Sequence, residues 1–484
     1  MTGRRPRHPL VALGIVALTG VVVLEGSWLA FDALADDGPQ RTAAQATEAS
    51  AALATPLLSV RRAPSALSRS ASSAELERAL APLLGIVGDR SCVQVALDGR
   101  TVAAKHETIG VIPGSNEKLP IAAAALEVLG RDHVFTTKVS GVVGPDASVV
   151  GDLALIGGGD PLLATEWYPD SAPKYPQRPA TRLEDLADAV VAAGVRSVTG
   201  SVVGDESRYD TERYAPFWDA SLQKTDVGPL SALMVNDDSV SAGQVKVDDP
   251  ALAAAQLLAQ LLRARGVTIA NDSRVATAPA GAATIASVAS APLGDILAEM
   301  LANSDNNTAE LLVKELGFAR GGAGTRAAGL TVARDALVAL GLPVDGVVLQ
   351  DGSGLGRGNQ LTCAFLGALL ARYGLADPIP AGMAVAGTTG TLGPEFTTSP
   401  VRGRLRAKTG SLAGVKSLSG YLPVDGGAGG RGATIEFALV LNAPAANDVA
   451  YYRPIWESRL AKVLATYPSG PTADQLAPPA AGGA

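Results

Sequence analysis

The stretch PGSNEKLP, residues 113–120, places Ser115 three residues before Lys118 at the expected start of a helix. Residues three apart lie on one face of a helix, so the hydroxyl and the amine can meet. The next stretch, LPIAAAALEVLG at 119–130, is apolar on nearly every side and predicts a helix buried inside a domain. Burial lowers the pKa of a lysine, and a neutral amine can take the proton of a serine that attacks a carbonyl.

The same spacing occurs twice more, at Ser171/Lys174 and Ser221/Lys224. Prolines surround the first of these pairs and the second leads into a turn, so neither predicts a helix start. Taken alone, the pair at residues 115 and 118 is more often an ordinary helix start than a catalytic pair.

Two further motifs change that balance. The string SDN, Ser304 to Asn306, falls between two predicted helices, and KTGS, Lys408 to Ser411, ends a predicted strand. Each has an ordinary structural interpretation, a helix cap for Ser304 and a strand end for Lys408. Arg402, Arg404, Arg406 and Lys408 alternate, so they predict one basic strand face that either attracts an anionic peptide or is simply solvated.

Together, and in this order, the three motifs resemble the set shared by serine β-lactamases and penicillin-binding proteins. The chain is similar to the class C low-molecular-mass penicillin-binding proteins, the D-alanyl-D-alanine carboxypeptidase/endopeptidase family. In that family a large insert separates the first motif from the second, and here Ser304 follows Ser115 by 189 residues. The likeness covers roughly residues 73–468 and includes the stretches GDLALIGGGDPLL, GPLSALMVNDDSV, DGSGLGRGNQLT and GTTGTL. One departure is Gly114, where alanine is more usual.

The resemblance implies a serine-type D-Ala-D-Ala carboxypeptidase/endopeptidase that acts on peptidoglycan stem peptides through an acyl-enzyme and is acylated by penicillins. It makes Ser115 the nucleophile and Lys118 its general base. It also implies that Ser304 and Lys408 relay a proton to the leaving amine, while Asn306 holds the substrate's peptide carbonyl. The positive charge of Lys408 is expected to lower the pKa of Lys118.

The resemblance assigns substrate binding to the strand that carries the third motif. Thr409 and Lys408 receive the terminal carboxylate, and Gly410 and Ser411 continue the binding strand. The backbone N–H groups of Ser115 and Ser411 form the oxyanion hole. Either carboxypeptidase or endopeptidase action is compatible with these motifs.

Two other functions are compatible with the same residues. A serine β-lactamase would hydrolyse its acyl-enzyme quickly, but the 189 residues between the first two motifs count against it. A non-catalytic cell-wall-binding or β-lactam-binding protein would use the insert, but the three intact motifs count against that.

The composition of the chain limits its possible partners and cofactors. A chain of 484 residues predicts two or three domains, and the net charge of -7 argues against nucleic acid as a partner. Three histidines and two cysteines are too few for most metal sites, and no metal or cofactor is expected. Cys92 and Cys363 are expected to be buried free thiols, with a single disulfide as the alternative in an exported chain.

The N-terminal segment indicates export. Arg4, Arg5 and Arg7 precede the uncharged run PLVALGIVALTGVVVL at 9–24. This order is typical of a secretory signal or of an anchor in the membrane, and ALA at 33–35 resembles a signal-peptidase site. Either possibility places the remainder outside the cytoplasm, in the cell envelope.

We therefore expect an α/β (α+β) protein with the penicillin-binding/serine β-lactamase-like fold and a strand-rich domain inserted between the first and second motifs. The predicted parts are a signal or anchor at 1–35, a flexible linker at 36–72, the catalytic domain at 73–142 and 289–468, the insert at 143–288, and a disordered tail at 469–484.

Overall fold

A six-stranded antiparallel sheet joins the first and last parts of the chain. The computed structural model describes residues 63–168, 179–239, 245–424 and 433–477. The order of strands in the sheet is β12-β13-β14-β15-β1-β2. Their bounds are β1 (Cys92–Leu97), β2 (Arg100–Lys105), β12 (Ala384–Val385), β13 (Arg406–Leu412), β14 (Val415–Val424) and β15 (Ala433–Asn442). The predicted hairpin turn at Asp98 and Gly99 is confirmed, with φ of 49° and 75°, which such a turn requires.

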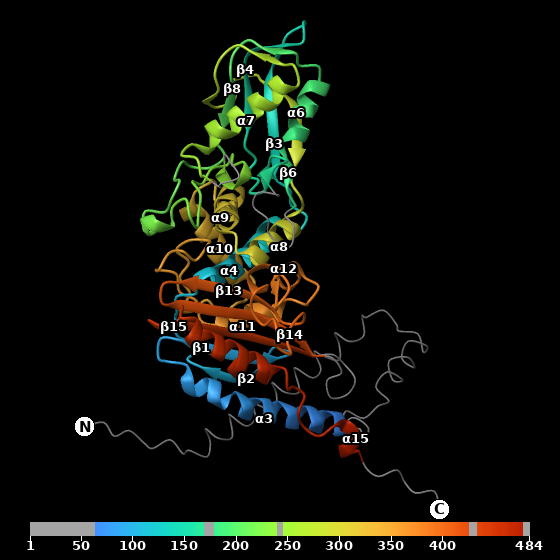
Figure 1. The fold of residues 1–484 in the computed structure, drawn as a ribbon, viewed down its shortest axis with the longest axis vertical. Coiled ribbons are helices and arrows are strands. Elements are labelled where there is room, and N and C mark those ends of the chain that lie inside the picture. The colour runs from blue at the N-terminus through green and yellow to red at the C-terminus, as the bar shows by residue number, and fades with distance from the viewer. Residues whose placement is uncertain (1–62, 169–178, 240–244, 425–432, 478–484) are drawn as a thin grey trace, which may run out of the picture. The chain divides into compact units, whose positions relative to one another are not determined.

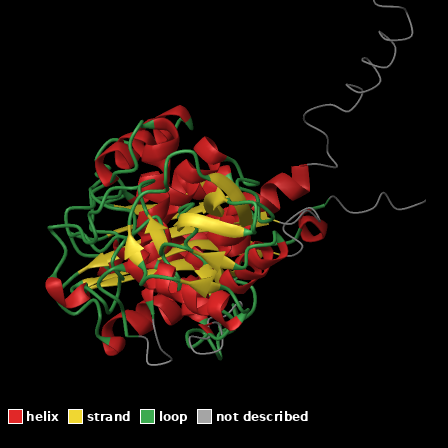
Figure 2. Cartoon of the chain, turned by 90° about the horizontal axis from the view of Figure 1, so that it is seen from above, coloured by secondary structure: helices red, strands yellow, loops and turns green. Residues whose placement is uncertain are grey.

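Helices cover both faces of this sheet (Figures 1 and 2). Successive strand residues point to opposite faces, so Val440 of β15 enters one core while Leu439 enters the other. The first core contains α4 (Lys118–Leu129), α8 (Leu293–Asn303), α9 (Asn306–Arg320), α10 (Arg326–Ala339), α11 (Cys363–Arg372) and α12 (Pro378–Gly382). The second contains α3 (Ala63–Ile86), α13 (Val449–Pro454), the π-helical segment η5 (Ile455–Ala461) and α14 (Lys462–Leu464).

A second sheet lies in the chain between α4 and α8, and it has seven strands in the described residues. Five follow the order β10-β8-β4-β3-β11, while β7 pairs with β4 and with β9. Their bounds are β3 (Thr136–Val143), β4 (Ser148–Ile156), β7 (Ser197–Val198), β8 (Val202–Asp205), β9 (Thr268–Ile269), β10 (Arg274–Val275) and β11 (Ala283–Ala289). The helices α6 (Leu183–Ala192) and α7 (Pro250–Ala264) share a hydrophobic core with this sheet. A short pair, β5 (Leu163–Ala164) and β6 (Thr181–Arg182), stands apart.

The insert also contains a segment that packs against the catalytic part. Between β8 and α7, residues 206–239 form little regular structure beyond two short 3-10 turns, η2 (Ala220–Leu222) and η3 (Asn236–Asp238). Arg208 of this segment makes a bidentate ion pair with the buried Glu315 of α9, at 2.9 and 2.7 Å. Asp210 pairs with Lys314 of the same helix at 2.5 Å. The chain between α4 and α8 therefore contains both the seven-stranded sheet and a segment that packs against α9.

Several predicted boundaries differ from the structure. β3 begins at Thr136, inside the part assigned to the catalytic domain, yet it lies between β4 and β11 in the inserted sheet. Helix α3 begins at Ala63, so residues 63–72 are helical and not a linker. Residues Ala473–Leu476 form α15, closed by a capping box, within the tail expected to be disordered.

The predictions for residues 1–62 and 478–484 lie outside the described residues. Within the part of the chain that the structure describes, no helix is both long and apolar enough to cross a membrane.

Candidate active site

The first motif lies where a 3-10 turn, η1 (Gly114–Glu117), runs directly into α4. Lys118 Nζ donates a hydrogen bond to Ser115 Oγ at 3.1 Å, so the two side chains meet as the spacing predicted. Gly114 has a φ of 54°, and a Cβ there would lie 3.2 Å from the backbone nitrogen of Ser411. The departure from alanine therefore has a local reason: glycine tolerates this φ and lets the turn approach β13 closely.

Lys118 is fully buried and its ammonium has three hydrogen-bond acceptors. Besides Ser115, it donates to Asn306 Oδ1 at 2.6 Å and to the carbonyl oxygen of Ser353 at 2.7 Å. Burial lowers the pKa of Lys118 to about 8, although nearby carboxyls act in the opposite direction. Burial also raises the pKa of Glu117 well above its usual value and that of Glu310 to about 8. In both cases burial disfavours the charged carboxylate.

The second motif lies at the junction of α8 and α9. Ser304 ends α8 with a left-handed φ of 63°, and Asp305 begins α9 by accepting a hydrogen bond from the backbone N–H of Thr308 at 2.9 Å. This sharp turn directs Ser304 Oγ to Lys408 Nζ, at 2.8 Å, and Asn306 to Lys118. Asn306 Nδ2 donates to the carbonyl oxygen of Asp226, at 2.7 Å, so the insert reaches the site.

The third motif occupies the last part of β13, which ends one residue after it at Leu412. Gly410 allows β13 to approach η1, because a Cβ there would lie 2.7 Å from the carbonyl oxygen of Pro113 and 3.0 Å from the nitrogen of Ser115. Thr409 Oγ1 donates to Thr391 Oγ1 at 2.8 Å.

The basic strand face predicted around Lys408 does not exist. β13 begins at Arg406, and residues 402–404 lie in turns. Arg402 donates to the carbonyl oxygen of Gly387 and Arg404 to that of Pro423. Lys408 itself is fully buried. The error arose because the alternation in the sequence starts before the strand does.

The two buried lysines affect each other's charge. Burial, and then the charge of Lys118, hold the pKa of Lys408 well below its usual value. Burial is the largest cause of the lowered pKa of Lys118. Two ammonium groups repel each other in a buried site, so a proton on one of these lysines disfavours a proton on the other.

The structure thus brings the three motifs together from three distant parts of the chain. The Ser-x-x-Lys string at 221 and 224 does not share this site. Ser221 donates to Asp219 in an exposed turn, and Lys224 pairs with the exposed Asp248. The pair at 171 and 174 lies outside the described residues.

Sequence reasoning missed the loop that orients Lys118. Glu310 of α9 accepts hydrogen bonds from the backbone N–H groups of Gly352 and Ser353, at 3.0 and 2.7 Å. Asp351 accepts from Trp218 Nε1 of the insert at 2.8 Å. These contacts hold the Ser353 carbonyl against Lys118. The sequence stretch DGSGLGRGNQLT contains this loop. It contributed to the family resemblance, but no role could be assigned to it from the sequence.

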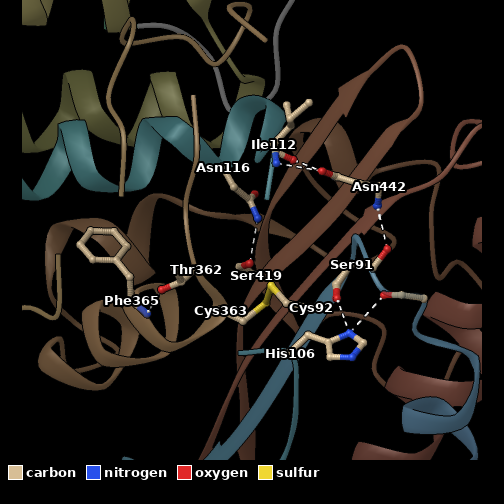
Figure 3. The surroundings of a disulfide bond; sticks show 11 residues. Ser91, Cys92, His106, Ile112, Asn116, Thr362, Cys363, Phe365, Ser419 and Asn442 are labelled. Carbon is tan, nitrogen blue, oxygen red and sulfur yellow. Dashed lines mark hydrogen bonds between the residues drawn. A yellow bond between two sulfur atoms is a disulfide. The ribbon is translucent and has the colours of Figure 1, made fainter. Parts of the chain in front are cut away.

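A disulfide lies below the first motif, between β1 and the first residue of α11 (Figure 3). Cys92 and Cys363 are bonded, with Cα atoms 5.9 Å apart, so the expectation of two free thiols was wrong. Both are fully buried as expected, but no local pattern shows that they face each other. Beside them, Asn442 of β15 accepts from Ile112 N and donates to Ile112 O, which fixes the chain entering η1.

Comparison with known proteins shows the family to which this chain belongs. The model of the D-Ala-D-Ala carboxypeptidase 3 (S13) family matches residues 74–245 and 239–457. The chain belongs to this family. A D-alanyl-D-alanine carboxypeptidase of an Actinomadura species is 31% identical over 415 residues, which cover 69% of this chain and 73% of the relative. A carboxypeptidase of Mycobacterium tuberculosis is 31% identical over 386 residues, which cover 76% and 78%.

The fold of this chain is also found among solved structures. Penicillin-binding protein 4 of Haemophilus influenzae, 19% identical, superposes with a TM-score of 0.62 over 79% of this chain and 97% of that one. The predicted mixed α/β fold and the predicted peptidase family are therefore confirmed.

Proposed function

We propose that this chain is a serine-type D-Ala-D-Ala carboxypeptidase/endopeptidase that forms an acyl-enzyme on Ser115. Family membership supports the class of reaction. The observation that carries the residue assignment is the hydrogen bond of 3.1 Å between Ser115 Oγ and a buried lysine whose pKa is about 8. A fully buried amine with so low a pKa can release its proton near neutral pH and act as a base.

The proposed acylation begins with neutral Lys118 taking the proton of Ser115 Oγ as this oxygen attacks the carbonyl carbon of the D-Ala-D-Ala peptide bond. The backbone N–H groups of Ser115 and Ser411 stabilise the oxyanion. Ser304 and Lys408 pass a proton to the leaving nitrogen, and terminal D-Ala departs as the peptide bond breaks. Water then attacks the ester carbonyl and gives up a proton to Ser115 Oγ as the bond between this oxygen and the carbonyl carbon breaks, which releases the shortened peptide with a carboxyl group and restores the hydroxyl of Ser115.

The substrate's own carboxylate has a further role in this mechanism. Docked beside Thr409 and Lys408, its negative charge favours a proton on Lys408. A charged Lys408 in turn favours the neutral form of Lys118, because the two ammonium groups repel each other. Binding of an anionic chain end thus prepares the base.

We assign Asn306 two tasks. It holds Lys118 through its Oδ1 atom, and its Nδ2 atom donates to the substrate's peptide carbonyl. In the free chain Nδ2 donates to the Asp226 carbonyl at 2.7 Å, so substrate replaces this contact.

We propose that the enzyme works in the cell envelope on peptidoglycan stem peptides ending in D-Ala-D-Ala, and that penicillins acylate it. Residues 1–35 would serve as its export signal or membrane anchor. The disulfide supports this location, since such bonds persist in oxidising compartments outside the cytoplasm.

Intact-mass analysis after incubation with benzylpenicillin tests the proposal. We expect one adduct, on the peptide that contains Ser115, and release of D-Ala from an acylated D-Ala-D-Ala peptide. Ser115→Ala should abolish the adduct and lower peptidase activity by up to about a million-fold, as in serine hydrolases without their nucleophile. Lys138→Met, which removes an exposed charge in the inserted sheet, is the matched control. An adduct on Ser221, or rapid continuous turnover of nitrocefin, would contradict the assignment.

A further inference from the structure

Lys416 of β14 lies directly opposite Ser411 of β13 in the sheet register. Side chains opposite each other in an antiparallel pair share one face, and Lys416 Nζ donates to Ser411 Oγ at 2.9 Å. An ammonium has no acceptor, so the Ser411 oxygen accepts and its own proton is left to donate elsewhere. Thr409, two residues earlier on β13, points to the same face. Ser411 itself is exposed.

Aromatic rings hold the Lys416 ammonium in place. Its nitrogen lies 4.2 Å from the ring centroid of Tyr452 and 5.3 Å from that of Trp456. Those two rings pack edge to face with centroids 5.0 Å apart, and Trp456 stacks on Phe396. Cation–π contacts with rings so fixed restrict the lysine to one position.

Among the described residues, the Lys416 ammonium makes no ion pair, although the nearby charge of Glu395 favours its protonated form. The carboxylate of Glu395, which lies nearby, pairs instead with Arg453 at 3.3 Å and accepts from Tyr452 at 2.9 Å. Within the described residues, the Lys416 ammonium therefore lies behind the Ser411 hydroxyl without an ion-pair partner. Because Ser411 Oγ accepts from Lys416, its own proton is available to a different acceptor.

We propose that Lys416 is a positioning residue that fixes Ser411 as a hydrogen-bond donor to the substrate's terminal carboxylate and adds a positive charge behind it. The inference rests on the proposed function and deepens it: the carboxylate subsite then includes a polarised Ser411 beside Thr409 and Lys408. Lys416 acts through Ser411 and does not touch the reacting atoms. It therefore contributes to selection for a free carboxylate, and not to proton transfer.

The test compares acylation by benzylpenicillin, which has a carboxylate, with acylation by its methyl ester, which has none. Lys416→Met keeps an apolar stem against the rings but removes the donor and the charge. The rate constant with the acid should fall about tenfold, as expected for loss of a partly exposed charge-assisted contact, while the ester's rate changes less than about twofold. Lys416→Arg should restore most of the acid's rate, and Lys138→Met should behave as wild type with both compounds.

Equal losses with acid and ester would show a merely structural role and overturn the inference, as would unchanged rates with both. Lys416→Gln retains a donor without charge and gives a second variant should the methionine protein fold poorly. Its ratio of acylation rates with the acid and with the ester should fall by an intermediate factor. An unchanged ratio would again overturn the inference. Absence of any wild-type adduct would instead refute the proposed function, which the Ser115 experiment detects independently.

Discussion

Replacing Lys408 by methionine tests which of the two buried lysines carries the proton. In the structure, the pKa of Lys408 lies well below its usual value, whereas that of Lys118 is about 8. We therefore expect Lys118, and not Lys408, to carry the proton in the free enzyme. Methionine fills the buried position without a donor, whereas alanine would leave a cavity.

The expected magnitudes follow from these values. With a pKa of about 8, roughly a tenth of Lys118 is neutral at pH 7 and about nine tenths at pH 9, so acylation should accelerate about tenfold between them. Lys408→Met removes the hydrogen bond of 2.8 Å to Ser304 Oγ and the docking of the substrate's carboxylate. Hydrogen bonds to charged groups are worth ~1.5–3 kcal/mol, which corresponds to a rate about 10- to 150-fold lower. The pH midpoint should stay near 8.

Stopped-flow acylation by benzylpenicillin from pH 6 to pH 10 measures both quantities, with an enzyme-free blank for hydrolysis of the antibiotic. Lys408→Arg, which restores a charge with a different geometry, should recover part of the rate. The matched control is again Lys138→Met. A midpoint raised by about one pH unit in Lys408→Met would show that Lys408 is charged in the free enzyme and would refute the reasoning. Rates equal to wild type at every pH would remove Lys408 from the mechanism.

Two further predictions concern stability and domain structure. Replacing Cys92 and Cys363 together by serine removes a cross-link that closes a loop of 271 residues, and should lower the free energy of unfolding by about 2–5 kcal/mol. Thermal melts should show this loss of stability. A reducing agent should bring the wild type to the level of the variant but leave the variant unchanged. Coincident melts of the two proteins without reductant would count against a stabilising disulfide. A fragment of residues 134–291 keeps β3 and β11 whole, so it should melt cooperatively and bind no penicillin, whereas 143–285 lacks the strand between β4 and β11 and should stay unfolded. An unfolded 134–291 fragment would argue against an independent inserted domain.

The helices and the hairpin were predictable because their signals are local. The apolar run after Lys118 could only be a buried helix, and α4 spans Lys118–Leu129 with its residues from Lys118 to Ala125 fully covered. Asp98 and Gly99 suit the positive φ of a tight turn. The motif residues were identified in the same way, since each motif is a short string whose chemistry is carried by side chains.

The partners of those residues depend on the tertiary structure alone. The Ser353 and Asp226 oxygens that orient Lys118 and Asn306 are backbone carbonyls, which any residue could supply, so no sequence pattern marks them. β3 was placed in the catalytic domain from the sequence, because the residues of a strand do not specify which strands it pairs with.

Local sequence thus specifies which side chains this protein has for acyl transfer and which helices present them. The pKa values of these side chains, and the groups that contact them, are set only when the chain folds. Lys118 and Lys408 would have the same pKa in water, and only the burial of each, together with their proximity, sets them apart. The register that brings Lys416 to Ser411, and the packing that joins Cys92 to Cys363, likewise arise when distant segments meet. Burial and non-local pairing are properties of the whole folded chain, and no short stretch of sequence specifies them.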